Sequence, residues 1–549
     1  MKNLRKLLCL LLAVLMITGC TNLPGAETTA PVDDPNVSEK TEAALAQIAQ
    51  LGSSPDDNYR TWYEIFVYSY CDSNGDGIGD LNGVTSKLDE LTALGINGIW
   101  LMPIHPSTSY HKYNVTDYYE IDPAYGTMED FDNLLAECEK RGIKVILDLV
   151  LNHTGYTHEW FQTAIKYLRD LPEGKEPDVA ECKYLDYYFF SKNNGPGMRK
   201  ISGSDWYFEG QFDYQMPDLN FGNEALRSDI KDIMQFWLDK GVGGFRLDAA
   251  KEFYTGHVSK NVEVLSWIQK TATSIDPDCY LVAEVWENEG TIASYYKSGI
   301  TSIFNFGYAN STGKIIQTLR GAGVEHTVSA YVAALEGTNK AFRENNPDYI
   351  DAPFLSNHDI GRIAGFASRN ELKIKMAGAM NIFMSGSVFI YYGEEIGMTG
   401  SGNDPSKRAP MYWNAERNNG TTNPPPECEL PDEYPFGSLA EQKGDDNSIY
   451  NYYRQAVAIR NALPAISHGV TTAEEALNVN CISAQRKTWN DQSCIILMNV
   501  NTEAAQVDLS AYSDWTVAAT LSADGNEITQ EGSALNLPAF GIAVLIPNT

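Results

Sequence analysis

The sequence predicts an α/β protein: a (β/α)8 TIM barrel with a small inserted B domain after its third strand and a C-terminal antiparallel β-sandwich. From residue 60, short apolar runs alternate with amphipathic stretches, which is typical of a parallel sheet covered by helices on both faces. Residues 154–205 form a connection that is too long for a simple loop. After residue 465, strand-like runs broken by polar turns replace the alternation and indicate the sandwich.

Eight apolar runs have the length and composition of parallel strands. Between the first two, apolar residues from Leu81 to Leu91 recur at helical spacing, and Gly95 is a stop signal. Eight strand–helix units over roughly 400 residues suffice to close a barrel. The runs are EIFVY (64–68), GIWLMPI (98–104), KVILDLV (144–150), GFRLD (244–248), YLVAEV (280–285), SIFNF (302–306), PFLSN (353–357) and VFIYYG (388–393).

The domain boundaries are predicted from these changes of pattern and from the composition of the N-terminus. They place a lipoprotein signal peptide at 1–19, a flexible tether at 20–58, the barrel at 59–153 and 206–464, the B domain at 154–205, and the β-sandwich at 465–549.

The N-terminus has the features of an export signal, with basic residues followed by the apolar run LLCLLLAVLMI. The run ITGC, which ends at Cys20, resembles a bacterial lipobox, in which the cysteine is lipidated and becomes the mature N-terminus. An ordinary signal peptide that happens to end in cysteine is the alternative. We expect a lipid anchor at Cys20 and a folded body at the extracellular face of a bacterial cell membrane. The Pro-, Thr-, Ala- and acid-rich residues 20–58 suit a tether.

The composition excludes some partners. With 72 acidic and 41 basic residues the formal charge is −31, and a surface that acidic repels phosphate backbones, so we expect no nucleic acid partner. A neutral ligand is permitted, and the 31 Tyr, 20 Phe and 10 Trp suit stacking on sugars, although most of them belong to the core. Beyond Cys9 and Cys20 seven cysteines remain, an odd number, so no complete disulfide framework is predicted.

Charged and imidazole groups follow four of the predicted strands. The third strand contains Asp148 and leads to His153, the fourth ends in the run RLD, the fifth contains Glu284, and the seventh leads to the run NHD. One such residue is usually a helix cap or a surface charge, but four strands converge on one rim of a barrel. Three carboxylates, an arginine and two histidines around one mouth, without zinc-type Cys/His spacing, suit glycoside hydrolysis.

Acetal cleavage needs an acid for the leaving oxygen and a carboxylate that meets the developing oxocarbenium carbon. Arg246 precedes Asp248 by two residues on the same strand face and would keep that carboxylate ionised, as a nucleophile must be. Glu284, if carboxylates surround it, would have a raised pKa and serve first as acid and then as base.

Four motifs resemble those of the α-amylase family of glycoside hydrolases in order, spacing and context. They are DLVLNHT (148–154), GFRLDAAKE (244–252), AEVWE (283–287) and FLSNHD (354–359), and the runs QMPDLN (215–220), YHKYNVTDYYEIDPAYGT (110–127) and APMYWN (409–414) resemble further family segments. The resemblance extends from about residue 60 to the end of the chain. It implies the barrel, B domain and β-sandwich that the pattern predicts.

The resemblance also implies roles for individual residues. It implies a retaining double displacement, for which two carboxyl groups lie about 5–5.5 Å apart. It makes Asp248 the nucleophile, Glu284 the general acid/base, Asp359 the carboxylate that grips sugar hydroxyls, Tyr113 the aromatic platform, Arg246, His153 and His358 hydrogen-bonding residues at the cleaved sugar, and Lys251 a contact beyond the cleaved bond.

The substrate is expected to be starch, maltodextrins and maltooligosaccharides, cleaved at α-1,4 bonds by an endo-acting α-amylase. Ala249 stands where relatives that cut α-1,6 bonds often have Val, and QMPDLN is intermediate between oligo-1,6-glucosidase-like and neopullulanase-like forms. The alternatives are an exo-acting α-glucosidase or oligo-1,6-glucosidase, a neopullulanase-type enzyme, and a non-catalytic surface starch-binding lipoprotein. Asn114 and Glu252 depart from common family residues, and Glu252 leaves a second calcium site open.

The run DSNGDGIGD (72–80) follows the first predicted strand and alternates acidic and amide residues with glycine. Its twelfth position, Gly83, excludes an EF-hand, and its carboxylates would repel phosphate. Similar loops hold structural calcium in relatives of the family, and hard oxygen ligands suit Ca²⁺. An unoccupied acidic turn is the alternative. The expected Ca²⁺ ligands are Asp72, Asn74, Asp76, the carbonyl of Ile78, and Asp80.

Overall fold

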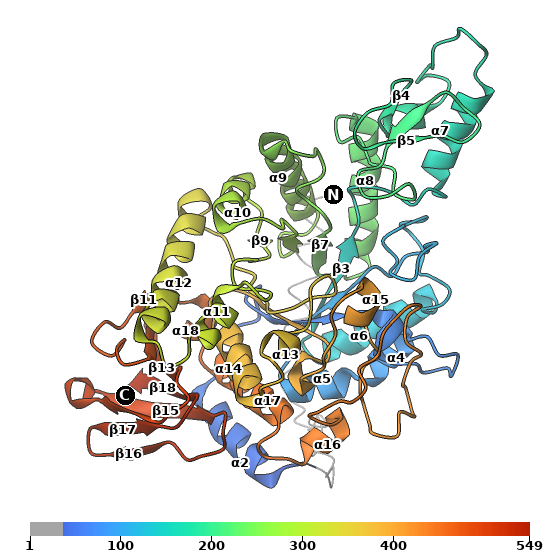
Figure 1. Cartoon of the computed structure of the whole chain (residues 1–549). Coiled ribbons are helices and arrows are strands. Elements are labelled where there is room, and N and C mark those ends of the chain that lie inside the picture. The colour runs from blue at the N-terminus through green and yellow to red at the C-terminus, as the bar shows by residue number, and fades with distance from the viewer. Residues whose placement is uncertain (1–36, 549) are drawn as a thin grey trace, which may run out of the picture. The chain divides into compact units, whose positions relative to one another are not determined.

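The computed structural model describes residues 37–548. Its central element is a parallel sheet with strand order β10-β1-β2-β3-β7-β8-β9 (Figure 1). The strands are β1 Thr61–Ile65, β2 Gly98–Leu101, β3 Lys144–Leu149, β7 Gly244–Leu247, β8 Tyr280–Ala283, β9 Ser302–Ile303 and β10 Val388–Tyr391.

The segment between β9 and β10 completes the ring, because single parallel bridges join Phe304 to Ala352 and Phe354 to Phe389. The predicted barrel is therefore confirmed, but the expected strand at 353–357 is reduced to these bridges. Pro353 has no N–H to donate and so interrupts a regular ladder at this position.

Helices surround the sheet, as the alternating pattern predicted (Figure 1). The predicted stop at Gly95 is confirmed, because this residue ends its helix in the left-handed conformation with φ 87°. The barrel helices are α3 Val67–Tyr70, α4 Leu81–Ser86, α5 Leu88–Leu94, α6 Met128–Lys140, α8 Glu224–Asp239, α9 Val258–Ile275, α10 Glu289–Tyr295, α11 Lys314–Arg320, α12 Glu325–Asn345, α13 Ile363–Phe366, α14 Glu371–Ile382, α15 Asp404–Lys407, α16 Leu439–Lys443, α17 Ile449–Ala462 and α18 Ala465–His468.

The barrel interior is packed with aromatic side chains. Because strand residues alternate between faces, Trp62 and Glu64 share the inner face of β1. The Trp62 ring is fully buried and stacks on Tyr280 at 5.0 Å and on Phe389 at 5.8 Å between ring centroids. This apolar layer lies beneath Glu64. The polar groups at the C-terminal ends of the strands are therefore supported from below by tightly packed side chains.

The B domain contains helix α7, Glu159–Asp170, and a small antiparallel sheet of strand order β4-β6-β5. Its strands are β4 Phe190–Ser191, β5 Met198–Lys200 and β6 Tyr207–Glu209. The predicted boundary at 205 is wrong, because β6 pairs with both other strands. Bridges from His153 to Asp218 and from Tyr188 to Leu219 then return the chain to the barrel.

The predicted C-terminal β-sandwich is confirmed as two antiparallel sheets, of strand orders β11-β12-β13-β18-β15 and β14-β17-β16. Leu497, Leu537 and Leu545 are buried in their shared hydrophobic cluster. The strands are β11 Val470–Ala473, β12 Ile482–Trp489, β13 Gln492–Asn499, β14 Ala505–Asp508, β15 Trp515–Ser522, β16 Thr529–Glu531, β17 Ala534–Leu537 and β18 Gly541–Pro547.

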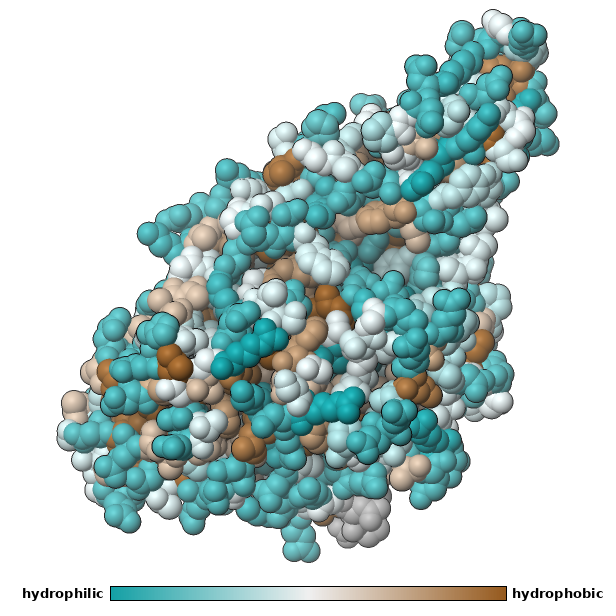
Figure 2. Space-filling model, in the orientation of Figure 1, coloured by the Kyte–Doolittle hydropathy of each residue, from teal (hydrophilic) through white to brown (hydrophobic). Residues whose placement is uncertain are grey.

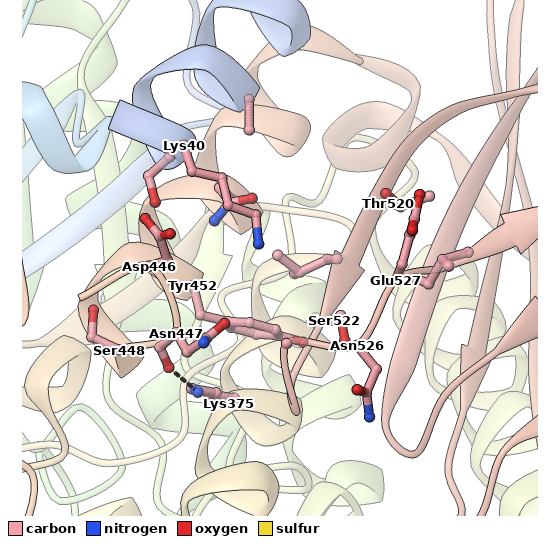
Figure 3. A pocket seen from close by; sticks show the side chains of 16 residues that line it. Lys40, Lys375, Asp446, Asn447, Ser448, Tyr452, Thr520, Ser522, Asn526 and Glu527 are labelled. Atoms are coloured by element: carbon pink, nitrogen blue, oxygen red, sulfur yellow. Dashed lines mark hydrogen bonds between the residues drawn. The ribbon is translucent and has the colours of Figure 1, made fainter. Parts of the chain in front are cut away.

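The predicted tether is wrong for its C-terminal part. Residues Glu39–Ile48 form helix α2, with Ser38 as its N-cap, and α2 packs on α17. The ion pair from Glu42 to Arg454, at 2.7 Å, fastens the helix to the folded body. A cavity of about 470 Å³ lies beside it, with Lys40 of α2 on one wall and Glu527, from the loop before β16, on the other (Figure 3). The signal peptide, Cys20 and the tether up to residue 36 lie outside the described residues.

The face seen in Figure 2 is mostly hydrophilic, with hydrophobic residues scattered over it. Within residues 37–548, no helix has the length and apolar character needed to cross a membrane. The seven cysteines of this region are all free thiols, and only Cys428 is not buried.

We expect Gly244→Ala to destabilise the barrel. Gly244 begins β7 with φ +148°, and a Cβ there would lie 1.9 Å from the backbone oxygen of Tyr280 on the neighbouring strand. The free energy of unfolding should fall by more than about 2 kcal/mol, seen as a lower Tm. Gly241→Ala is the matched control, because Gly241 has φ +99° with nothing within 4 Å, and should cost only about 1 kcal/mol. Equal losses would contradict the clash.

Candidate active site

One buried arginine connects three carboxylates at the C-terminal ends of the barrel strands. Arg246, on β7, is fully buried, and its Nη1 lies 2.9 Å from Asp148 Oδ1 and 2.7 Å from Asp248 Oδ1. Its Nη2 lies 3.0 Å from Glu284 Oε2. The sheet register sets this geometry, because Arg246 is the direct neighbour of Asp148 on β3. One guanidinium thus fixes both carboxylates of the predicted double displacement.

The chain just after Asp248 also orients Glu284. The backbone N–H of Ala249 donates to Glu284 Oε2 at 3.0 Å. Ala249 has φ 45°, in the left-handed region that residues other than glycine rarely adopt. Such a conformation costs of order 1–3 kcal/mol and persists only where the surroundings enforce it. Here it directs a backbone donor at the side chain of Glu284.

Asp359 is the centre of a second group of contacts. Its Oδ2 lies 3.1 Å from His358 Nε2, and its Oδ1 lies 2.9 Å from Arg408 Nη2. His358 Nδ1 lies 2.6 Å from Glu64 Oε1, and the hydroxyl of Tyr113 lies 2.7 Å from His358 Nε2. The same hydroxyl donates to Asp148 Oδ2 at 3.0 Å, which joins the two groups.

The surroundings set the protonation of these groups. Burial raises the pKa of Glu284; Arg246 opposes the rise, and Asp248 and Asp359 add to it. Burial lowers the pKa of His358, but the carboxylates of Asp359 and Glu64 outweigh burial and raise it to about 9. Burial also opposes the ionisation of Asp359, yet the facing His358 imidazolium and then Arg408 hold its pKa well below its usual range. The site therefore combines an ionised carboxylate with a proton-retaining one.

The other predicted sugar-binding residues lie at different distances from this centre. His153 is buried, its Nε2 lies 3.2 Å from the carbonyl oxygen of Tyr113, and burial lowers its pKa. Lys251 lies further out and pairs with Glu287 at 3.0 Å. The structure thus brings together all the predicted catalytic and sugar-binding residues except Lys251, which pairs with Glu287 and Glu252.

Sequence reasoning assigned no role to several residues of the site. Glu64 and Arg408 carry no predicted role, and Asp148 is predicted only as a charged residue of the third strand that begins a motif. Arg408 also lies near Tyr110, to whose hydroxyl its Nη1 donates at 3.1 Å. Two signals were available: Glu64 is the charged residue in the apolar run EIFVY, and Arg408 directly precedes the run APMYWN.

The loop 72–80 is held together by its own hydrogen bonds. Asp72 accepts from the backbone of Gly75 and Gly77, and Asp76 accepts from Ile78. Asp80 caps α4 through Gly83 N and accepts from Ser73. Carboxylate, amide and carbonyl oxygens are the ligand type that Ca²⁺ prefers, so the donor chemistry of the loop fits this ion. Yet among residues 37–548 no three His, Cys, Asp or Glu side chains are grouped closely enough to hold a metal ion.

The barrel, the carboxylate cluster around Arg246 and the second cluster around Asp359 together define a class of protein. Two carboxyl groups held by one guanidinium, one of them with a raised pKa, next to a third carboxylate that stays ionised, form the apparatus of a glycoside hydrolase.

Comparisons with known proteins identify the family. Residues 64–469 match the family described as alpha amylase, catalytic domain. Alpha-amylase 3 of Dictyoglomus thermophilum is 40% identical, over 80% of this chain and 84% of its own. A glucan 1,6-alpha-glucosidase of Streptococcus pneumoniae is 33% identical, over 72% and 83%. Among solved structures, Eubacterium rectale Amy13B has a TM-score of 0.89 and 42% identity, over 93% and 99%. The chain belongs to the alpha-amylase family of glycoside hydrolases.

The raised pKa of His358 predicts a pH-dependent contribution to stability. The value is about 9 in the folded protein against an ordinary 6.5, so the stabilisation is complete below pH 6.5 and is lost as the pH rises through 9. We expect the Tm of the wild-type protein to fall over this range by more than that of His358→Gln, which does not titrate. Parallel Tm profiles of the two proteins would contradict a charged His358.

Proposed function

We propose that the protein is an endo-acting α-amylase that cleaves α-1,4-glucosidic bonds of starch, maltodextrins and maltooligosaccharides with retention of configuration. Asp248 is the nucleophile, and Glu284 protonates the leaving oxygen and then activates water. Asp359 holds sugar hydroxyls, and Tyr113 forms the platform beneath the ring at the cleaved bond. The shared Arg246 supports the nucleophile role, because its guanidinium lies 2.7 Å from Asp248 Oδ1 and holds that carboxyl group in place on the rim.

Endo action is supported chiefly by two exposed aromatic side chains near the site. Trp286 follows Glu284 by two residues, is 43% exposed, and stacks on Phe306 at 5.2 Å between ring centroids. Phe212 is 48% exposed and contacts the ring of His153 at 5.8 Å. Exposed aromatic faces suit stacking on sugar rings beyond the cleaved bond. They lie on separate segments, the loop after β8 and the end of the B domain, which suits a glucan chain longer than one residue.

An exo-acting α-glucosidase is the second candidate, because the Streptococcus pneumoniae relative is named a glucan 1,6-alpha-glucosidase. A neopullulanase-type activity belongs to the same range of specificity. A non-catalytic starch-binding protein is disfavoured, because all three predicted catalytic carboxylates are present and each pairs with Arg246 or His358 on the same rim.

Endo and exo action are separated by p-nitrophenyl maltooligosaccharides that are blocked at the non-reducing end. We expect the wild-type protein to release p-nitrophenol from the blocked substrate once a coupling glucosidase is present. Asp248→Asn should lower this rate by roughly 10⁴-fold or more, since it removes the nucleophile. Cleavage of the unblocked substrate alone would replace the endo assignment with the exo one. Full activity of Asp248→Asn would overturn the mechanism.

We propose further that the loop 72–80 binds a structural Ca²⁺ through oxygens of Asp72, Asn74, Asp76, Ile78 and Asp80. Bound calcium would stabilise the folded state by mass action, so EDTA should lower the Tm and added CaCl₂ should restore it. Asp76→Asn removes one charge from an exposed ligand and should weaken the CaCl₂ response. An unchanged Tm in EDTA would leave the loop as an acidic turn without a metal.

The N-terminal sequence supports a proposal on location. We propose that Cys20 carries the lipid and that the enzyme acts at the extracellular face of a bacterial cell membrane. An enzyme in this position would meet glucan polymers that are present outside the cell.

A further inference from the structure

Glu64 is a buried carboxylate that the proposed reaction does not use. It lies on the inner face of β1, next to the run of apolar residues that fills the barrel, and its side chain is 2% exposed. Its Oε1 receives two hydrogen bonds from one residue: from Nδ1 of His358 at 2.6 Å and from the backbone N–H of His358 at 3.4 Å. A carboxylate in such a place is costly unless it is paired, so His358 is the group that stabilises it.

The opposite side of the same imidazole faces the reaction centre. His358 Nε2 lies between the hydroxyl of Tyr113 at 2.7 Å and Oδ2 of Asp359 at 3.1 Å. Tyr113 donates its own proton to Asp148, so its oxygen accepts from Nε2. For this arrangement Nε2 must carry a proton, and Nδ1 carries one toward Glu64. Both ring nitrogens are then donors, which describes an imidazolium.

We propose that Glu64 is a positioning residue for glycoside hydrolysis, which holds the His358 ring as a double donor so that Nε2–H stays directed at Asp359 and Tyr113. This inference rests on the proposed role of Asp359. Without a carboxylate at position 64, the ring would keep one proton and could place it on either nitrogen. Asp359 would then lose a cationic partner on the side opposite Arg408, and its oxygens would be free to turn.

Every group that packs against the ring is consistent with this role. Glu64 comes from β1, Tyr113 from the loop after β2, and Asp359 from the same loop as His358. The ring of Trp100, on β2, meets the imidazole edge-to-face at 5.7 Å between centroids. Arg408 contacts only the backbone of His358, through Nε and the carbonyl oxygen at 3.2 Å. No cation among the described residues therefore competes with the imidazole for Glu64.

The test is a double-mutant cycle of Glu64→Gln and His358→Gln, assayed by kcat/KM on a maltooligosaccharide that the wild-type enzyme cleaves. The change from glutamate to glutamine keeps the side-chain volume and one acceptor oxygen but removes the charge. We expect Glu64→Gln to lower kcat/KM by about 10- to 100-fold, the range for loss of a charged hydrogen bond. In the His358→Gln background the same change should have little further effect, because Glu64 acts through the ring. Additive losses would overturn the proposal.

The control is Glu395→Gln, which removes another buried carboxylate. Glu395 bonds to the hydroxyl of Tyr63, the neighbour of Glu64 on β1 that points to the opposite face. It should leave kcat/KM within about twofold, since it touches no residue of the site. Equal losses from both Glu→Gln changes would mean a general effect on folding, against the proposal.

A direct measurement follows the His358 ring by ¹³C and ¹⁵N NMR, with His358→Gln used to assign its signals. In the wild-type protein the imidazolium should persist to about pH 9, and in Glu64→Gln it should titrate at lower pH. An unchanged titration would overturn the role of Glu64 even if the enzyme proved inactive on every maltooligosaccharide. Conversely, the wild-type protein could be inactive while Glu64→Gln still shifts the titration of the His358 ring. That result would reject the proposed function but support the effect of Glu64 on His358.

Discussion

The placement of one positive charge inside the barrel governs the rest of the site. A guanidinium as deeply buried as that of Arg246 would be prohibitively costly without compensating anions. Three carboxylates from three strands meet this need, and the parallel register holds them at contact distance. Removal of any one would take a hydrogen-bonding or ionic partner from the buried guanidinium in a medium of low polarity. The requirements of folding and of catalysis thus fall on the same ion cluster.

A second consequence is that the charge balance around Arg246 differs from the charge balance around Asp359. Around Arg246, carboxylates outnumber the cation, which favours retention of a proton on Glu284. Around Asp359, His358 and Arg408 outnumber the anion, and the carboxylate stays ionised. Two environments on the same rim therefore give the carboxyl groups of Glu284 and Asp359 different tasks. The hydroxyl of Tyr113 links the two environments through Asp148 and His358.

Much of the fold and of the site could be predicted from the sequence. Buried parallel strands are nearly continuous apolar runs, so seven of eight strands were placed, and the carboxylates that follow them marked the rim. The exceptions have physical reasons. Pro353 interrupts a ladder that its neighbours would otherwise form. Helix α2 has the composition of a tether, and it is held by α17, which lies some four hundred positions later. Glu64 is likewise defined only by its contact with His358, a pairing that no local pattern reveals.

The free thiols have a consequence for the conditions in which the protein can work. A domain exported from the cell often depends on disulfides for stability, and those bonds are lost under reducing conditions. Here six of the seven cysteines in the described part of the chain are buried, and burial raises the pKa of Cys138, Cys279 and Cys494 to about 12. Such thiols are poor nucleophiles and act as small apolar side chains. The fold of residues 37–548 is therefore held together without a disulfide that reducing conditions could break.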